Sequence, residues 1–183
     1  MACFVIAAHP PAGLVRNPKG GDGAAGQELV MEDGVSDVFT AGRVTAGVLI
    51  IGDEILSGRT QDTNLRDIAR YLAGFGVELA EARTVSDVQD EIVAALNALR
   101  ERYDYVITTG GIGPTHDDIT ADAVAAAFGV ELFEHPDILA MMQSRWGGEL
   151  NAARRRMARV PQGGELVNNP VQGPPGFTIG NVF

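Results

Sequence analysis

The feature that most constrains the fold is the alternation of short apolar runs with segments of helical periodicity along residues 44–129. Residues 44–51 are an apolar run ending in Gly-Asp-Glu, which is typical of a buried parallel strand that leads into a loop. Residues 77–84 and 103–109 are two further strand candidates. Helical segments of about 10 to 15 residues separate the strands, as in βαβ units. The sequence therefore predicts an α/β fold with a mainly parallel sheet, right-handed crossovers and helices on both faces.

Three helices are predicted from apolar residues that recur every three or four positions. The first covers residues 63–75, and Asp62 or Thr63 can cap its start. The second begins after Asp87, which we predict as its cap. The third begins at Thr120, again a predicted cap. Beyond these, the pattern indicates two more helices and two short strands, at residues 135–146, 152–158, 165–169 and 177–183.

Domain organisation follows from a change of composition near residue 44. Residues 10–26 are rich in Pro, Gly, Asn and Lys and have little periodicity. We interpret residues 1–43 as a flexible extension, or as the product of a translation start placed too far upstream; a regulatory arm is a further interpretation. Residues 44–183 form the predicted domain. Because the sequence stops at Phe183 within an apparent strand, we expect this domain to be incomplete at its C-terminus.

Charge and composition argue against several classes of function. A formal net charge of −10 disfavours nonspecific binding to nucleic acid or to anionic membranes, which need clustered positive charge. The single cysteine, Cys3, rules out an intramolecular disulfide and a cysteine-based zinc site. Apolar runs stay short of the ~18 residues that span a bilayer, and the start of the chain lacks the pattern of a signal peptide. We therefore expect a cytoplasmic protein with no nucleic-acid or membrane partner.

The strongest local signal is the glycine loop, which we define as residues 109–118, with the sequence Thr-Gly-Gly-Ile-Gly-Pro-Thr-His-Asp-Asp. Glycines let backbone N–H groups approach an anion, and the start of the helix that follows adds partial positive charge. Parallel α/β folds bind ligands at this edge of the sheet. The loop matches neither the P-loop nor the Rossmann pattern. We predict that it binds a phosphate through Thr109, Gly110, Gly111, Gly113, Pro114 and Thr115.

The end of this loop carries two adjacent acidic residues, Asp117 and Asp118. Two carboxylates beside a phosphate repel it unless a cation or hydrogen bonds neutralise them. Because Mg²⁺ commonly bridges carboxylates and phosphates, both are candidate ligands of Mg²⁺ or another divalent cation. The alternative is that Asp118 only caps the next helix. His116 is a candidate for proton transfer, with a simple solvated histidine as the alternative.

Two other connections contain side chains that could contact a ligand. The first follows the first strand, and its candidate binding residues are Gly52, Asp53, Glu54, Ser57, Gly58, Asp62 and Asn64. A solvated loop with Asp62 as a cap is the alternative. The second, residues 168–176, indicates by itself only a rigid turn. The basic run Arg154, Arg155, Arg156 and Arg159 is interpreted as a solvated helix face, with contact to a nucleotide phosphate as the less favoured alternative.

Taken together, these motifs resemble the MoaB/Mog-like molybdopterin-binding domain. The resemblance rests on Gly52-Asp53-Glu54, Ser57-Gly58, Asp62-Thr63-Asn64, and the glycine loop followed by Ile119-Thr120. It covers about residues 44–183 and is closest to the N-terminal domain of CinA-like (competence-damage-inducible protein A) proteins; the domain fused to eukaryotic FAD synthases is also similar. It implies a three-layer α/β/α domain that forms a homo-oligomer, a dimer or a trimer.

The resemblance also implies roles for single residues. Gly110, Gly111 and Gly113 would hold the phosphate of the ligand. Asp118 would serve metal-assisted chemistry, and Asp87 maps onto a second acidic position of the family. In the connection at residues 168–176, the residues implied to lie near the ligand are Asn169, Pro170 and Gly176.

Three functions remain open at this point. Mog-like proteins adenylylate molybdopterin with Mg-ATP, so the first hypothesis is a molybdenum-cofactor-biosynthesis domain that binds molybdopterin or an adenine nucleotide. CinA-like and FAD-synthase-linked domains are associated with metal-dependent hydrolysis of ADP-ribose or FAD, so the second is a nucleotide pyrophosphatase. The Asp117-Asp118 doublet and the Gly-Asp-Glu loop favour this branch. The third hypothesis is a non-catalytic binding domain.

Overall fold

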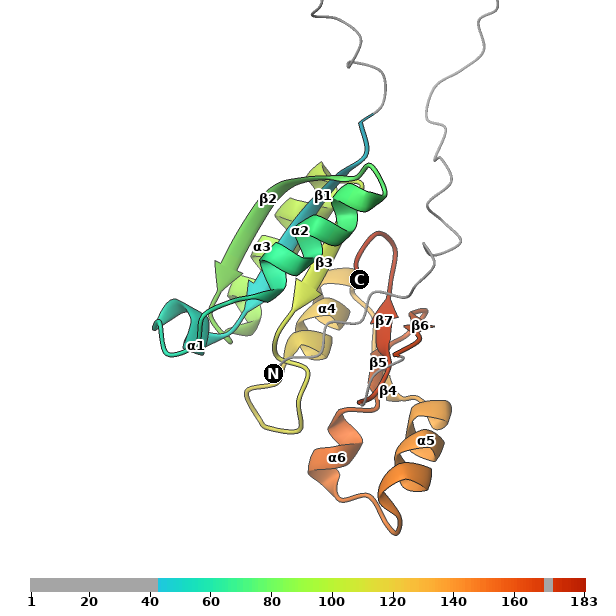
Figure 1. Cartoon of the computed structure of the whole chain (residues 1–183). Coiled ribbons are helices and arrows are strands. Elements are labelled where there is room, and N and C mark those ends of the chain that lie inside the picture. Colours follow the sequence, from blue (N-terminus) through green and yellow to red (C-terminus); the bar gives the residue numbers. More distant parts are fainter. Residues whose placement is uncertain (1–42, 170–172) are drawn as a thin grey trace, which may run out of the picture.

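A computed structural model describes residues 43–169 and 173–183 of the chain (Figure 1). The predicted N-terminal extension, apart from its last residue, lies outside the described residues, and so does Pro170. Cys3 also falls outside them. Within the described ranges, no helix combines the length and the apolar character needed to cross a membrane.

The central sheet is parallel, as the alternating pattern predicts. Its three strands are β1 (Thr45–Ile51), β2 (Glu78–Val85) and β3 (Tyr105–Thr109), in the order β2-β1-β3. The middle strand, β1, is buried at every position after Thr45. Such burial on both faces is typical of a parallel strand between two helical layers, and it explains the uninterrupted apolar run of this segment.

Helices cover both faces of this sheet, which confirms the predicted α/β/α layers (Figure 1). The helices are α2 (Asn64–Gly74), α3 (Gln89–Arg102) and α4 (Thr120–Phe128). Alternate residues of β1 point to opposite faces. Val48 and Ile50 pack in one core cluster with Ile68 of α2. On the other face, a second cluster joins β1 to α3 and α4 through Leu49, Ile51, Leu96, Leu99 and Val124.

A smaller unit follows α4 and extends past the end of the sheet that carries the glycine loop (Figure 1). It contains β4 (Leu132–Glu134), α5 (Pro136–Trp146), α6 (Ala152–Arg156) and β5 (Arg159–Pro161), and β4 pairs with β5 in antiparallel fashion. A hairpin of β6 (Glu165–Val167) and β7 (Gly176–Thr178) completes it. This unit has its own core, formed by Ile138, Met142, Leu150, Ala158 and Val160. The strands β4 and β5 were not predicted from the sequence, because three residues are too few to show a period.

Two predicted helix caps are wrong. The starts of α3 and α4 both lack a side-chain cap. The Asp87 carboxylate instead accepts a hydrogen bond from the backbone amide of Asp53, with a distance of 2.9 Å from N to Oδ2. The Thr120 hydroxyl donates to the carbonyl oxygen of Gly110 at 2.8 Å. Both side chains therefore tie a helix start to a neighbouring connection, a tertiary contact that a local cap pattern cannot reveal.

The strand predicted at residues 177–183 is broken by a turn. Its first part is β7, which ends at Thr178. Gly180 then adopts a φ of +58°, a conformation that favours glycine, and turns the chain back. The last residues lie parallel to β3, where the Phe183 amide donates to the Val106 carbonyl oxygen at 2.8 Å. The C-terminal residues thus extend the parallel sheet beyond β3.

An ion-pair network on β2 gives a testable pH dependence. Hydrogen bonds from Arg83 and Tyr103 lower the pKa of the Glu81 carboxyl, and Arg102 adds to the effect. A carboxyl with a lowered folded-state pKa stabilises the fold above its unfolded pKa of about 4.3 and loses that contribution as pH falls through the folded value. We expect Glu81→Gln to have a lower Tm than wild type at pH 7, with the two melting curves converging below about pH 4. A difference in Tm that is the same at pH 7 and pH 3 would contradict this assignment.

Candidate functional site

The connections after the three parallel strands meet at one end of the sheet. The first connection begins with α1 (Asp53–Leu56), a short helix where the sequence predicted a loop. The second carries Asp87 between β2 and α3, and the third is the glycine loop after β3. Figure 1 shows α1 and the glycine loop at the same end of the sheet, beyond the carboxyl ends of the strands. This is the edge at which parallel α/β folds bind their ligands.

The glycine loop passes so close to β1 at Gly110 that this position must be glycine. Gly110 has a φ of +98°, and a Cβ atom placed on it would lie 1.9 Å from the carbonyl oxygen of Ile51. A Cβ atom on Gly111, where φ is +59°, would lie 2.4 Å from the hydroxyl oxygen of Thr120. The backbone amide of Thr120 donates to the Gly111 carbonyl oxygen at 3.1 Å. The loop is therefore held against both β1 and the start of α4.

The middle of the loop exposes backbone donors. Among the described residues, the amides of Ile112 and Gly113 donate to no backbone carbonyl oxygen. The Ile112 side chain is 62% exposed, which places this part of the loop at the surface. Backbone N–H groups without a backbone acceptor at a loop and helix start are what an anion-binding concavity needs.

Asp118 closes the far end of the glycine loop. Its Oδ2 atom accepts hydrogen bonds from the backbone amide of Thr115 at 2.8 Å and from the Thr115 hydroxyl at 2.6 Å. The same oxygen leaves no room for a side chain on Gly113, where a Cβ atom would lie 2.7 Å away. Asp118 is half-buried and does not cap α4, so the interpretation as a simple cap is wrong.

The neighbouring pair, His116 and Asp117, points into solvent. The imidazole Nε2 lies 3.2 Å from the Asp117 carboxylate, and the two side chains are 91% and 69% exposed. Nothing in this arrangement orients the imidazole toward the glycine loop amides. The predicted roles of His116 in proton transfer and of Asp117 in metal binding remain predictions.

The acidic residues of the first and second connections lie together. Asp87 accepts from the Asp53 amide, and the Ser86 hydroxyl donates to the Asp53 carboxylate. Burial raises the pKa of the Asp87 carboxyl; the Asp53 amide opposes this, and the carboxylates of Asp53, Glu54 and Asp117 raise it further. Carboxylates of the glycine loop and of the first connection therefore act electrostatically on Asp87 of the second.

The raised pKa of Asp87 yields a prediction about stability. When the folded-state pKa of an acid is above its unfolded value, about 3.9 for Asp, stability falls as pH rises through the interval between the two. Asp87→Asn removes the charge and keeps an acceptor for the Asp53 amide. We expect its Tm to exceed that of wild type at pH 7 and the gain to disappear below about pH 4. Thermal unfolding at both pH values checks this, and a lower Tm at pH 7 would contradict it.

Other predicted residues of the first connection support its local structure. The Asn64 side-chain amide donates to the Thr109 hydroxyl at 2.7 Å and so joins α2 to the start of the glycine loop. Gly52 is buried, with a φ of +155°, and a Cβ atom there would lie 2.7 Å from the Glu54 carboxylate. The Ser57 hydroxyl accepts from Arg59, and Gly58 has a positive φ, so both shape the turn after α1.

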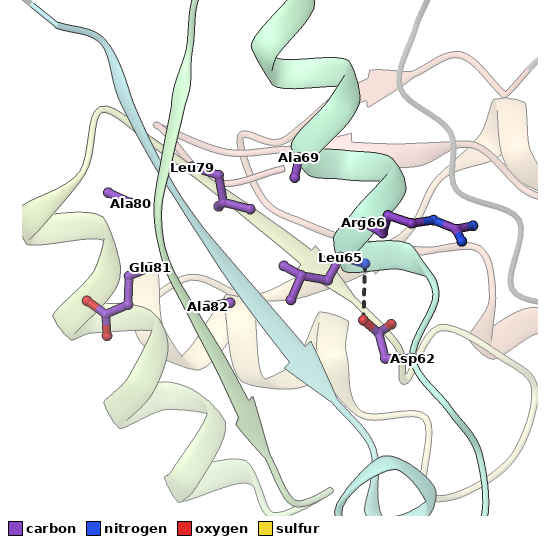
Figure 2. Close-up of a pocket in the computed structure, with 8 residues that line it drawn as sticks. All are labelled: Asp62, Leu65, Arg66, Ala69, Leu79, Ala80, Glu81 and Ala82. Carbon is purple, nitrogen blue, oxygen red and sulfur yellow. Dashed lines mark hydrogen bonds between the residues drawn. The ribbon is translucent and has the colours of Figure 1, made fainter.

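Asp62 caps α2, as the alternative interpretation predicted. Its carboxylate accepts from the amides of Asn64 and Leu65, both at 3.1 Å, and Figure 2 shows the second of these bonds. Asp62 borders a groove between α2 and β2 that is also lined by Leu65, Ala69 and Leu79 (Figure 2). This groove runs beside the edge strand and includes none of the glycine loop residues.

The connection at residues 168–176 is described only in part. Asn169 donates to the carbonyl oxygen of Pro174 at 3.1 Å, and Gly176 begins β7 opposite Val167. These contacts shape the hairpin connection itself. Proximity of Asn169 and Gly176 to a ligand therefore remains a prediction from the resemblance.

The arginine run is a solvated face only in part, because Arg154 and Arg155 are exposed whereas Arg156 and Arg159 are half-buried. Arg155 pairs with Glu134 of β4, and Arg159 pairs with Asp122 of α4. Arg156 donates from Nη2 to the backbone carbonyl oxygen of Asp118 at 3.3 Å. The contact of Arg156 with the glycine loop could not be placed from sequence, because the four arginines look alike there. In the structure, Arg156 and Arg159 are both half-buried, and of the four it is Arg156 that donates to the loop.

The described residues contain no group of three His, Cys, Asp or Glu side chains arranged to hold a metal ion. The carboxylates around the glycine loop are nevertheless the oxygen donors that Mg²⁺ prefers. Mg²⁺ often takes only one or two protein carboxylates and completes its coordination with water and substrate phosphate. The donor chemistry of Asp118 and its acidic neighbours therefore fits such an ion only together with a phosphate ligand.

The α/β/α fold and the glycine loop at the carboxyl end of its parallel strands are shared with a known family. The family model described as a probable molybdopterin binding domain matches residues 47–180, and the chain belongs to this family. It is 45% identical over 135 residues to a CinA-like protein of Citrifermentans bemidjiense, a match that covers 72% of this chain and 33% of the relative. Protein Ta0487 of Thermoplasma acidophilum is 37% identical over 133 residues, covering 72% of this chain and 52% of that protein.

A solved structure agrees with these relatives. The crystal structure of the protein CinA from Thermoplasma acidophilum, described as having unknown function, matches with a TM-score of 0.71 and 35% identity. The match covers 77% of this chain and 87% of that one. The chain spans about a third of the length of the CinA-like relatives, so an activity of those whole proteins does not pass directly to it.

Proposed function

We propose that this domain binds a small ligand through its phosphate, at the glycine loop, and that the ligand is molybdopterin or an adenine nucleotide. The observation that carries the proposal is the pair of Ile112 and Gly113 amides, which donate to no backbone carbonyl oxygen among the described residues. They lie on a loop that Gly110 presses against β1 and that leads into α4. Backbone donors beside a helix start attract phosphate without any requirement for a particular side chain.

A loop of this kind does not by itself choose the ring system of the ligand. A pterin phosphate and a nucleotide present the same oxygens to the backbone. The family name favours molybdopterin, whereas similarity to CinA-like proteins leaves a nucleotide equally open. The choice is therefore the first thing that an experiment has to decide.

Binding is tested by isothermal titration calorimetry of the purified chain with inorganic phosphate, AMP, ADP-ribose, FAD and anaerobically prepared molybdopterin, each with and without Mg²⁺. We expect saturable binding of at least one phosphate ester, and no binding of adenosine, which lacks the phosphate. Absence of binding to every phosphate compound would overturn the proposal. Light scattering of the same samples tests the expected homo-oligomer.

A second candidate function is metal-dependent hydrolysis of the pyrophosphate in ADP-ribose or FAD. It is favoured by the acidic rim, which we define as Asp53, Glu54, Asp87 and Asp117, because these carboxylates act on one another electrostatically beside a phosphate loop. A divalent cation, when bound with the substrate, would neutralise phosphate charge and lower the pKa of attacking water. Asp118 would orient the loop and offer a carboxylate oxygen, and the loop amides would hold the phosphate.

Hydrolysis is tested by AMP release from ADP-ribose, FAD, NAD and ATP in the presence of Mg²⁺, Mn²⁺ or Co²⁺. Metal-dependent AMP release would establish a nucleotide pyrophosphatase. Binding without turnover of any substrate would instead favour molybdopterin binding or a non-catalytic domain. We expect the protein to act in the cytoplasm, which localisation of the full-length chain can check.

A further inference from the structure

Arg156, at the end of α6, is the basic side chain with a hydrogen bond to the glycine loop. Its Nη2 atom donates to the Asp118 carbonyl oxygen at 3.3 Å, and the side chain is half-buried. Its Nε atom is buried and has no hydrogen-bond partner among the described residues. Nor does any carboxylate in those residues lie within ion-pair distance of its guanidinium. A cation in this position is only partly satisfied by the protein.

The other arginines of the run have partners of their own. Arg155 is paired with Glu134, Arg159 makes two hydrogen bonds to Asp122, and Arg154 lies over the Trp146 ring at 5.1 Å. These contacts brace α6 and β5 against β4, α4 and α5. Of these four arginines, only Arg156 donates a hydrogen bond to the glycine loop. The four residues therefore make different kinds of contact, although they look alike in the sequence.

We propose that Arg156 is a positioning residue for the glycine loop: it holds the Asp118 backbone and supplies positive charge to an otherwise acidic anion site. This inference rests on the proposed phosphate binding and adds the residue that makes such binding possible beside the acidic rim. It also assigns a role to the unit of β4, α5, α6 and β5, which presents Arg156 to the loop.

The first part of the argument is geometric. Asp118 is held on both sides, by Arg156 at its backbone carbonyl and by Thr115, whose amide and hydroxyl donate to its carboxylate. Loss of the Arg156 contact frees the Asp118 peptide and, through it, the turn that includes Gly113. The Ile112 and Gly113 amides then lose their common orientation, and an anion has to order them again at an entropic cost.

The second part is electrostatic. A carboxylate-rich rim repels a phosphate dianion. A half-buried guanidinium without an anionic partner costs solvation energy, and an anion bound nearby would offset that cost. We therefore expect the Arg156 guanidinium to be destabilised by partial burial in the ligand-free protein and to be stabilised when phosphate binds nearby.

The test compares three variants in titrations with inorganic phosphate and ADP-ribose. Arg156→Gln removes the charge, Arg156→Lys keeps it, and Arg155→Gln is the matched control on the same short helix. We expect Arg156→Gln to raise Kd about tenfold or more, as loss of a charged hydrogen bond usually does. Arg156→Lys should recover most of the affinity, and Arg155→Gln should bind like wild type. Because salt screens the charge, the wild-type advantage over Arg156→Gln should shrink as salt increases.

A measurement on the wild-type protein covers the case in which Arg156→Gln does not fold. The buried Nε–H group of Arg156 gives a slowly exchanging arginine side-chain NMR signal, which is assigned by its absence in Arg156→Lys. We expect this signal to shift on addition of phosphate or ADP-ribose. An unshifted signal at saturation, or equal affinities of Arg156→Gln and wild type, would overturn the inference alone. Failure of wild type to bind any phosphate compound would overturn the proposed function as well.

Discussion

Asp118→Asn is expected, under the pyrophosphatase proposal, to reduce metal-dependent AMP release by on the order of a hundredfold or more, with little change in Tm. The size follows from the several kcal/mol that a correctly held cation contributes to a transition state with phosphate charge. The asparagine oxygen can still accept the two hydrogen bonds from Thr115, so the loop keeps its shape while the negative charge is lost. Steady-state assays with ADP-ribose and Mg²⁺, together with thermal unfolding, measure both quantities.

Two further variants separate the charge of Asp118 from its structural role. Asp118→Ala removes both the charge and the acceptor for Thr115, so we expect a larger loss of phosphate affinity than in Asp118→Asn. Asp122→Asn is the matched control, because Asp122 lies on α4 and its carboxylate pairs with Arg159 of β5. Full activity of Asp118→Asn would refute the catalytic assignment, and equal losses in Asp122→Asn would show a general effect of acidic residues on folding.

Gly110→Ala is expected to abolish phosphate binding and to destabilise the protein by about 2–5 kcal/mol. The added Cβ atom would lie 1.9 Å from the Ile51 carbonyl oxygen, a backbone atom that cannot rotate away. The φ of +98° adds strain that a residue with a side chain rarely tolerates. For a domain of this size, such a loss corresponds to a decrease in Tm of roughly 5–15 °C.

Gly129→Ala is the control for conformational strain without a steric clash. Gly129 ends α4 with a φ of +65°, and a Cβ atom there would meet nothing within 4 Å. We expect a loss of about 1 kcal/mol and unchanged ligand affinity. If Gly110→Ala behaves like Gly129→Ala in both unfolding and binding, the close approach of the loop to β1 is not essential to the site.

The family inferred from the sequence motifs is the family that the comparisons show. The motifs were sufficient because the fold restricts which residue can stand at a few of their positions. At Gly110 no other residue fits, because the loop backbone lies against the Ile51 carbonyl oxygen, and at Gly113 a side chain would have to displace the Asp118 carboxylate. Asp87 was placed in the site only through the resemblance. Taken locally it looked like a helix cap, and its bond to the Asp53 amide became evident only when two distant connections were brought together.

The sequence by itself determined the layers of this protein. The apolar run of β1 requires burial on both faces, and the helical periods on either side of it supply the covering layers. Glycines after β3 likewise predict a tight loop at the edge where parallel strands end. These features depend on near neighbours in the chain, and local residue patterns are sufficient to show them.

Only the tertiary structure decided the partners of the polar side chains. Asp87 and Thr120 bind neighbouring connections in place of their own helices, and Arg156 reaches the glycine loop from a separate unit. Such contacts join residues as far apart as 38 positions in the chain. A side chain with several possible partners selects among them by distance and burial, and both are properties of the folded chain alone.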